Sequence, residues 1–214
     1  MVMEKFRFYS LWLCLLCVLV FIFQVWIPVF TPTFILSQDA LIKPWQFLSA
    51  IFLHGSLTHL LYNLFALFIF GLILERTVGS KKFLLLFLIS GILANIFTFY
   101  FYPNSLGASG AIMAVIGCLA VLRPMMAVFS FGIILPMFAV AIIWIIGSFL
   151  GIFGFGDQGI GYIAHLSGLF IGVLYGFFLR LKYKQNNSLV YSTSRKVVIP
   201  EDAIRSWEEN YMKR

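Results

Sequence analysis

Four polar side chains in otherwise apolar stretches of the chain could together carry out acyl transfer. Ser109 offers a hydroxyl nucleophile, and His165 offers an imidazole that can accept its proton near neutral pH. His59 and Asn63, spaced i, i+4 on one helix face, could donate hydrogen bonds to a developing oxyanion, as could the backbone N–H of Ser109. These groups fill every role of a serine hydrolase except the orienting carboxylate, so we expect a Ser–His dyad.

The stretches that carry these side chains are too apolar for a soluble protein. Of 214 residues, 62% are hydrophobic and 11% are charged, with a mean hydropathy of +1.00, whereas soluble domains are about half apolar and a quarter charged. Unpaired backbone is not stable in lipid, so each apolar segment is predicted to be helical. The six segments are residues 11–30, 57–74, 83–102, 109–122, 125–149 and 160–179. The composition therefore predicts an all-α membrane protein with six transmembrane helices.

The chain divides into three parts by polarity. A short N-terminal stretch, 1–10, precedes the membrane domain, 11–181, which contains a long outer loop at 31–56, and a polar tail follows at 182–214. With the N-terminus in the cytoplasm, all Lys and Arg residues except Lys43 fall on the cytoplasmic side, as the positive-inside rule requires. The net charge of +7 is therefore topological and does not indicate nucleic-acid binding. We expect both termini in the cytoplasm and, from the short termini, a bacterial plasma membrane.

The four candidate side chains are predicted to lie at one depth in the bilayer. At about 1.5 Å per residue from the charged inner end of each helix, Ser109 lies about 21 Å and His165 about 22 Å above the inner edge. The same count places His59 at about 24 Å and Asn63 at about 18 Å. In a hydrocarbon core about 30 Å thick, all four lie roughly 6–12 Å below the outer face. Agreement across three separate helices indicates a single site.

The fourth apolar segment is too short to cross the bilayer alone. Residues 109–122 form about 21 Å of helix, so residues 103–108 must dip back into the membrane to meet it. Irregular backbone at that depth requires surrounding protein or water, so we expect Ser109 to begin a recessed helix at the floor of a wet cavity. Gly107 and Gly110 flank Ser109 and permit a tight turn and the close approach of a ligand.

The last apolar segment carries a stripe of small residues beside His165. The stripe consists of Gly168, Gly172 and Gly176. Small residues at this spacing let two helices approach closely. If the neighbouring helix is the fourth segment, His165 meets Ser109.

Four sequence motifs, in order, carry a family resemblance over about residues 40–180. They are His54–Asn63 (HGSLTHLLYN), Glu75–Gly79 (ERTVG), Gly107–Gly110 (GASG) and Ala164–Gly168 (AHLSG) followed by Gly172. Together they resemble the signatures of the rhomboid family of intramembrane serine proteases. The resemblance implies a six-helix rhomboid-like bundle that cleaves single-span membrane proteins near the outer face of the bilayer and needs no cofactor.

The resemblance also assigns roles to individual residues. It implies that Ser109 is the nucleophile, that His165 is the general base, and that Asn63 and His59 are oxyanion donors. His54 matches a supporting histidine of the family.

The resemblance extends to the fifth segment. The sequence departs from the usual family pattern at two positions. It implies that this segment, with Trp144 and Phe149, is a mobile lateral gate. Gln46 follows Trp45 where the family often has arginine. Met113 occupies the position of an aromatic residue that usually stacks on the base histidine.

Other kinds of site and function fit the sequence less well. Three histidines could bind zinc, but His54 and His59 leave a helix on different faces and no HExxH string occurs, so we expect no metal. The string that ends at Asp157 matches the GxGD motif of intramembrane aspartyl proteases, but no second aspartate lies in another apolar segment.

Two alternatives remain outside the enzymes. A catalytically inactive rhomboid-like chaperone or adaptor is expected to lack Ser109 or His165, and both are present. A small transporter would need polar groups that continue to the inner side, and the segments inward of Asn63 are almost wholly apolar.

Overall fold

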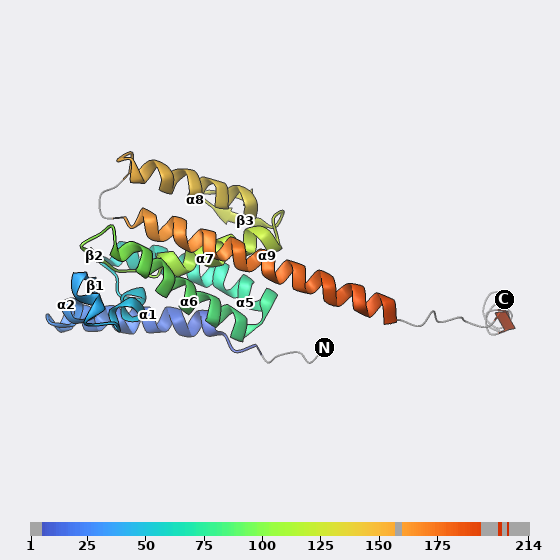
Figure 1. The fold of residues 1–214 in the computed structure, drawn as a ribbon, viewed down its shortest axis with the longest axis horizontal. Helices are drawn as coiled ribbons and strands as arrows, with labels where there is room; N and C mark the ends of the chain where they lie inside the picture. The colour runs from blue at the N-terminus through green and yellow to red at the C-terminus, as the bar shows by residue number, and fades with distance from the viewer. Residues whose placement is uncertain (1–5, 157–159, 194–200, 203–204, 206–214) are drawn as a thin grey trace. The chain divides into compact units, whose positions relative to one another are not determined.

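The chain folds into two compact units, residues 1–180 and 181–214. The computed structural model describes residues 6–156, 160–193, 201–202 and 205. The first unit is a bundle of helices (Figure 1). Its longer elements are α1 (Tyr9–Trp26), α4 (Leu57–Ala66), α5 (Leu72–Val78), α6 (Ser80–Phe99), α7 (Ser109–Leu122), α8 (Met137–Ile152) and α9 (Tyr162–Thr193), the last of which runs into the second unit.

Shorter elements connect these helices. They are α2 (Phe30–Phe34), β1 (Leu36–Ser37), η1 (Gln38–Leu41), α3 (Gln46–Ser49), η2 (Ala50–Phe52), η3 (Leu67–Gly71), β2 (Asn104–Ser105), β3 (Ala127–Ser130) and β4 (Ile133–Pro136). Asp157 and most of the predicted tail after Thr193 lie outside the described residues.

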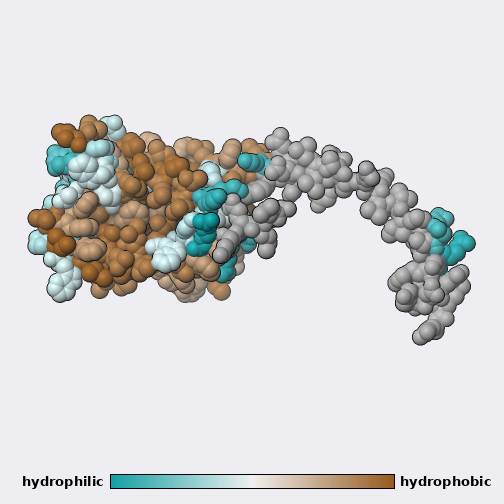
Figure 2. All heavy atoms as spheres, turned by 90° about the horizontal axis from the view of Figure 1, so that it is seen from below, coloured by the Kyte–Doolittle hydropathy of each residue, from teal (hydrophilic) through white to brown (hydrophobic). Residues whose placement is uncertain are grey.

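The helices have the lengths and the surface of a membrane protein. Four of the described helical stretches are long and apolar enough to cross a bilayer: 9–26, 57–78, 80–99 and 162–182. Helices α7 and α8 are also apolar but shorter. Figure 2 shows a broad hydrophobic surface over the first unit, with hydrophilic residues gathered toward its ends. The prediction of an all-α class is thus confirmed for a mainly helical membrane fold.

The second predicted segment forms one helix that is longer than expected. Helices α4 and α5 are joined without a break by the π-helical turn η3, so the helix runs from Leu57 to Val78 rather than to residue 74. Ser56 caps its start by accepting a hydrogen bond from the His59 backbone N–H at 3.1 Å. It ends at Gly79, whose φ of 92° lies where only glycine is comfortable.

The prediction of a single helix over residues 125–149 was wrong in nearly its first half. Strands β3 and β4 pair there as an antiparallel hairpin, and α8 begins only at Met137. Phe131 and Gly132 at the tip have positive φ, as a two-residue hairpin turn requires. Pro136 interrupts the backbone hydrogen bonding just before the helix. The run is apolar throughout, and uniform hydrophobicity does not distinguish a strand from a helix.

Helix α7 is the centre of the bundle. Its bounds agree with the predicted fourth segment, and nearly all of its residues are buried. It contacts α4, α5, α6 and α8. An apolar helix that is buried on all sides must be held by its neighbours rather than by an amphipathic face. The position of Ser109 at its start is therefore set by the whole bundle.

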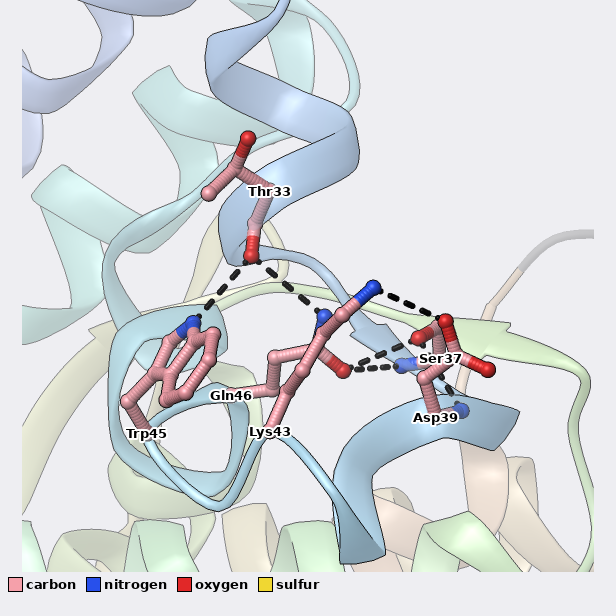
Figure 3. A network of polar contacts seen from close by, with 6 residues as sticks. All are labelled: Thr33, Ser37, Asp39, Lys43, Trp45 and Gln46. Atoms are coloured by element: carbon pink, nitrogen blue, oxygen red, sulfur yellow. Dashed lines mark hydrogen bonds and ion pairs between the residues drawn. The ribbon is translucent and has the colours of Figure 1, made fainter.

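The long loop at 31–56 is held together by the buried side chain of Gln46 (Figure 3). Its Oε1 accepts hydrogen bonds from the Ser37 backbone N–H at 3.1 Å and hydroxyl at 2.9 Å. Its Nε2 and the Trp45 indole N–H both donate to the Thr33 carbonyl, each at 3.3 Å. A neutral amide thus supplies both donors and acceptors at the position where the resemblance led us to expect arginine.

A buried carboxylate ties the start of α1 to the junction of α5 and α6. Glu75 accepts hydrogen bonds from the backbone N–H groups of Tyr9 and Ser10 and from the Ser10 hydroxyl, all at 2.9 Å. The Ser80 hydroxyl donates to it at 2.7 Å and accepts from the Arg7 N–H at 2.9 Å. The first N–H groups of a helix have no partner in their own helix. Glu75 supplies that partner from another helix.

We predict that Glu75→Ala lowers the free energy of unfolding by roughly 2–4 kcal/mol, because buried donors lose their acceptor. Glu75→Gln should cost less, since its amide keeps one acceptor oxygen. Chemical unfolding of the detergent-solubilised protein, followed by circular dichroism, measures both. The control is Asp39→Ala, which removes only the exposed ion pair with Lys43. Equal stability of Glu75→Ala and the control variant would contradict the prediction.

Candidate active site

Ser109 is the first residue of α7, and the chain before it is fixed to the long loop. Strand β2 pairs with β1, so that Ser105 lies opposite Leu36. Two residues on, the Gly107 N–H donates to the Ala50 carbonyl at 2.8 Å. Gly107 has a φ of 126°, a conformation that a residue with a side chain rarely adopts. The turn that leads into Ser109 therefore requires glycine at 107.

His59 and Ser109 meet at Gly107. A Cβ atom built on Gly107 would lie 2.8 Å from His59 Cε1, 3.0 Å from His59 Nε2 and 3.9 Å from the Ser109 hydroxyl oxygen. The imidazole edge and the hydroxyl therefore border the same small space. Helix α4 delivers His59 from one side, and the N-terminus of α7 delivers Ser109 from the other.

The hydrogen bonding of His59 favours the tautomer that would serve an oxyanion. The Gly55 backbone N–H donates to His59 Nδ1 at 3.4 Å, a long bond. A neutral imidazole that accepts at Nδ1 carries its proton on Nε2. This N–H is the one next to Gly107, so His59 presents a donor toward the space beside Ser109.

His54 supports His59 from behind. The two rings contact edge to face with centroids 5.1 Å apart. His54 is buried, and its Nδ1 lies 3.2 Å from the Phe52 carbonyl oxygen. Burial and, to a lesser degree, the nearby His59 lower the pKa of the His54 imidazole to about 4, and the hydrogen bond to Phe52 acts in the opposite direction. His54 is therefore neutral at physiological pH and donates from Nδ1.

Gln24 of α1 fixes the backbone of His54. Its Oε1 accepts from the His54 N–H at 2.9 Å, and its Nε2 donates to the His54 carbonyl at 3.2 Å and to the Thr31 hydroxyl at 3.1 Å. Sequence reasoning missed this residue. A polar amide inside the apolar segment 11–30 was the signal that could have found it.

Asn63 lies one turn further along α4 than His59 and is buried. Its Nδ2 donates to the His59 carbonyl at 3.0 Å. The amide nitrogen carries two protons, so one remains for another acceptor. The structure thus confirms that Asn63 and His59 share a helix, and it ties the Asn63 amide to the backbone of that helix.

Helices α7 and α9 contact each other backbone to backbone. A Cβ on Gly168 would overlap the Gly110 carbonyl, and a Cβ on Gly172 would overlap the Ala114 carbonyl. A Cβ on Gly176 would lie 3.1 Å from the Cys118 carbonyl oxygen. We call the contact made by Gly168, Gly172 and Gly176 the glycine seam. Residue numbers rise together along it on both helices, so the two helices are parallel. The close helix approach predicted for the glycine stripe is therefore found in the structure, and the neighbouring helix is the fourth predicted segment.

The parallel seam brings Ser109 and His165 to the same end. Ser109 immediately precedes Gly110, and His165 lies one turn before Gly168, which faces Gly110. His165 is buried, and its Nδ1 has no hydrogen-bond partner among the described residues. Its ring contacts the Trp144 and Tyr162 rings edge to face, with centroids 5.7 and 6.2 Å away.

The remaining predicted site residues fall into two groups. Met113 is buried in the main apolar core. Of the two predicted gate residues, Trp144 contacts His165, whereas Phe149 is exposed and packs on Phe153 with centroids 5.0 Å apart. Within the described parts of the chain, no three His, Cys, Asp or Glu side chains gather in a way that could hold a metal ion.

The model of the Rhomboid domain family matches residues 42–182, a span that includes Ser109, His165, His59 and Asn63. The chain belongs to the rhomboid family. It is therefore a rhomboid membrane protein, as the order of its motifs predicted.

Several curated rhomboids are similar to this one. It is 33% identical to the rhomboid protease GlpG of Haemophilus influenzae over 142 residues, which are 66% of this chain and 71% of GlpG. It is 40% identical to the rhomboid protease GluP of Bacillus subtilis over 129 residues, which are 60% of this chain and 24% of GluP. It is 35% identical to YdcA of Bacillus subtilis over 136 residues, and there the match spans 66% of the relative. The chain thus spans from about a quarter to about seven-tenths of these proteins.

The close contact at Gly168 predicts how an added methyl group there affects stability and activity. Gly168→Ala should lower the thermal midpoint by several degrees and reduce any hydrolytic activity, because the new methyl group overlaps the Gly110 carbonyl and moves Ser109 away from His165. The matched control is Gly147→Ala in α8, where a Cβ would meet nothing within 4 Å. Thermal unfolding in detergent measures both variants. Gly168→Ala at least as stable as Gly147→Ala would contradict the backbone contact.

Proposed function

We propose that this rhomboid is an intramembrane serine endopeptidase that hydrolyses peptide bonds of single-span membrane proteins. The observation that carries the proposal is the parallel glycine seam between α7 and α9, since it brings a serine hydroxyl and a histidine to one end of two closely packed helices. The relatives named as proteases support the same conclusion at the level of the family.

The proposed mechanism uses Ser109 and His165 in two successive stages, acylation and hydrolysis. His165 accepts the proton of the Ser109 hydroxyl, and the oxygen attacks the carbonyl carbon of the substrate peptide. The resulting tetrahedral intermediate collapses, His165 gives its proton to the leaving amine, and the acyl group stays on Ser109. A water molecule, deprotonated by His165, then hydrolyses the ester and restores both residues. A dyad without an orienting acid is supported by the environment of His165 Nδ1, which has no described hydrogen-bond partner.

The proposed oxyanion site comprises three donors. The His59 Nε2–H borders Gly107 beside the serine, and the backbone N–H of Ser109 belongs to the first turn of α7. The free proton of the Asn63 amide is the third donor. Donors that are held in place before the reaction stabilise the developing negative charge without reorganising during it.

The proposed placement in the membrane has six spans, with α7 recessed from the outer face. Its 14 residues reach only about 21 Å, and β2 and the turn at Gly107 lead the chain down to its start. We propose that both termini face the cytoplasm of a bacterial cell, because nearly all basic residues then lie inside. Substrates are therefore cut near the outer face, where water reaches Ser109.

We predict that Ser109→Ala and His165→Ala each reduce cleavage at least about a thousandfold, because each removes one half of the dyad. The measurement is cleavage of a model single-span substrate by the full chain reconstituted in liposomes. The control is Ser90→Ala, which removes a buried hydroxyl whose hydrogen bond among the described residues is to the Phe87 carbonyl of its own helix. Cleavage by Ser109→Ala at the wild-type rate would refute the proposed mechanism.

A second prediction concerns the oxyanion donors. His59→Ala should lower kcat by about 10²–10³-fold with little change in KM, because the donor acts on charge that appears in the transition state. The steady-state kinetics of the reconstituted protein separate the two constants. Tyr62→Ala, an exposed position on the same helix, serves as the control. A rise in KM alone would mean that His59 binds substrate instead.

A further inference from the structure

The ring of His165 is held by aromatic side chains rather than by hydrogen bonds at Nδ1. No described residue bonds that nitrogen, although it is buried. Trp144 meets the ring at an interplanar angle of 90°, and Tyr162 meets it at 85°. Edge-to-face geometry is one of the favoured arrangements of aromatic pairs and stabilises the ring orientation that makes it. These two contacts therefore favour one orientation of the His165 ring.

Both contacts depend on α8. Trp144 is a residue of α8 itself. Tyr162 stands on α9, but its ring fills the space beside Gly151 at the end of α8 and Gly156 just after it, where any added Cβ would overlap the ring. A shift of α8 would consequently disturb the imidazole through one aromatic ring directly and through the other by the loss of its packing.

Trp144 also packs against a second aromatic ring, in addition to that of His165. The Phe131 ring, at the tip of the β3–β4 hairpin, packs on Trp144 with centroids 5.8 Å apart. Phe131 has a φ of 55°, so the hairpin accepts an unusual backbone conformation at this residue. The hairpin, Trp144 and His165 thus form one continuous row of rings.

We infer that Trp144 is a positioning residue for His165, and that α8 holds the base in its reactive orientation. The inference rests on the proposed role of His165 as the general base. Loss of the Trp144 ring leaves the imidazole free to rotate away from Ser109, so fewer encounters have the geometry for proton transfer. The expected effect is a fall in kcat on the order of tenfold.

A gate role for Trp144 makes the opposite prediction. If the side chain only blocked the access of a transmembrane substrate, its removal would raise the cleavage rate or leave it unchanged. It would also leave the reaction of Ser109 with a small water-soluble fluorophosphonate unaffected, since that probe needs no lateral opening. A positioning residue must slow both reactions, because both need His165 to accept the serine proton.

The experiment compares Trp144→Leu with Trp144→Phe in the full chain reconstituted in liposomes. Its readouts are kcat and KM for a model single-span substrate and the rate at which a fluorophosphonate labels Ser109. Phe138→Leu is the matched control, because it makes the same kind of change on an exposed part of α8. We expect Trp144→Leu to lower kcat and the labelling rate about tenfold with KM within about twofold, and Trp144→Phe to restore most of both.

A spectroscopic readout reports on the contact without requiring activity. The chain has three histidines, so selective histidine labelling gives three ring signals in the NMR spectrum. Trp144→Leu should shift the His165 signal, through the lost ring current, and leave those of His54 and His59 in place. If the wild type does not cleave but this shift occurs, the proposed function fails while the contact stands.

Three outcomes would overturn the positioning role. They are unchanged labelling and cleavage in Trp144→Leu, a rise in KM with constant kcat, and a His165 ring signal that does not move. Failure of Trp144→Phe to recover any activity would also count against it, since a phenyl ring keeps an aromatic edge near the imidazole.

Discussion

The close contact of α7 with α9 is the constraint on which the rest of the molecule depends. Carbonyl groups of one helix occupy the places where Gly168 and Gly172 would otherwise carry Cβ atoms. In lipid, no hydrophobic driving force distinguishes a helix partner from an acyl chain, so helices associate through close packing and polar contacts. Glycine makes the packing possible here, and the parallel direction of the pair brings the two helix starts together. The seam therefore sets where the starts of α7 and α9, with Ser109 and His165, lie relative to the rest of the site.

Four polar side chains outside the seam form hydrogen bonds with the backbone of another element. Glu75 caps the start of α1, Gln24 holds both backbone groups of His54, and Gln46 binds the turn that contains Ser37. Asn95 of α6 likewise donates to the Phe47 carbonyl at 2.9 Å. A buried polar group costs free energy unless it finds such a partner. These residues therefore join irregular segments to helices that the apolar surfaces alone would not align.

The sequence predicted the parts of this structure that depend on spacing along one helix. The bounds of α7, the shared face of His59 and Asn63, and the glycine stripe all follow from counting residues, because helical geometry is regular. It did not predict the β3–β4 hairpin, where an apolar run fits either strand or helix and the turn at Phe131 decides. Nor did it predict the contact of Trp144 with His165, because this depends on the tilt of α8 against α9 rather than on any repeat.

The burial of Glu75 was missed for a related reason. The predicted segment ended at residue 74, just before Glu75, whereas the helix continues to Val78. The count could not foresee the hydrogen bonds from Tyr9 and Ser10, since they come from a segment 65 and 66 residues earlier. Long-range pairing is set by how elements dock, and a single sequence does not state it.

The π-helical turn η3 separates two tasks within one helix. A turn closed by i→i+5 hydrogen bonds holds one more residue than a regular turn for nearly the same rise, so it rotates everything that follows about the helix axis. Upstream of it, the imidazole of His59 is directed to Ser109; downstream, the carboxylate of Glu75 is directed to α1. The extra residue thus changes the face of the helix on which the later side chains lie. The side chains before and after η3 can therefore point in directions about the helix axis that a regular helix would not allow together.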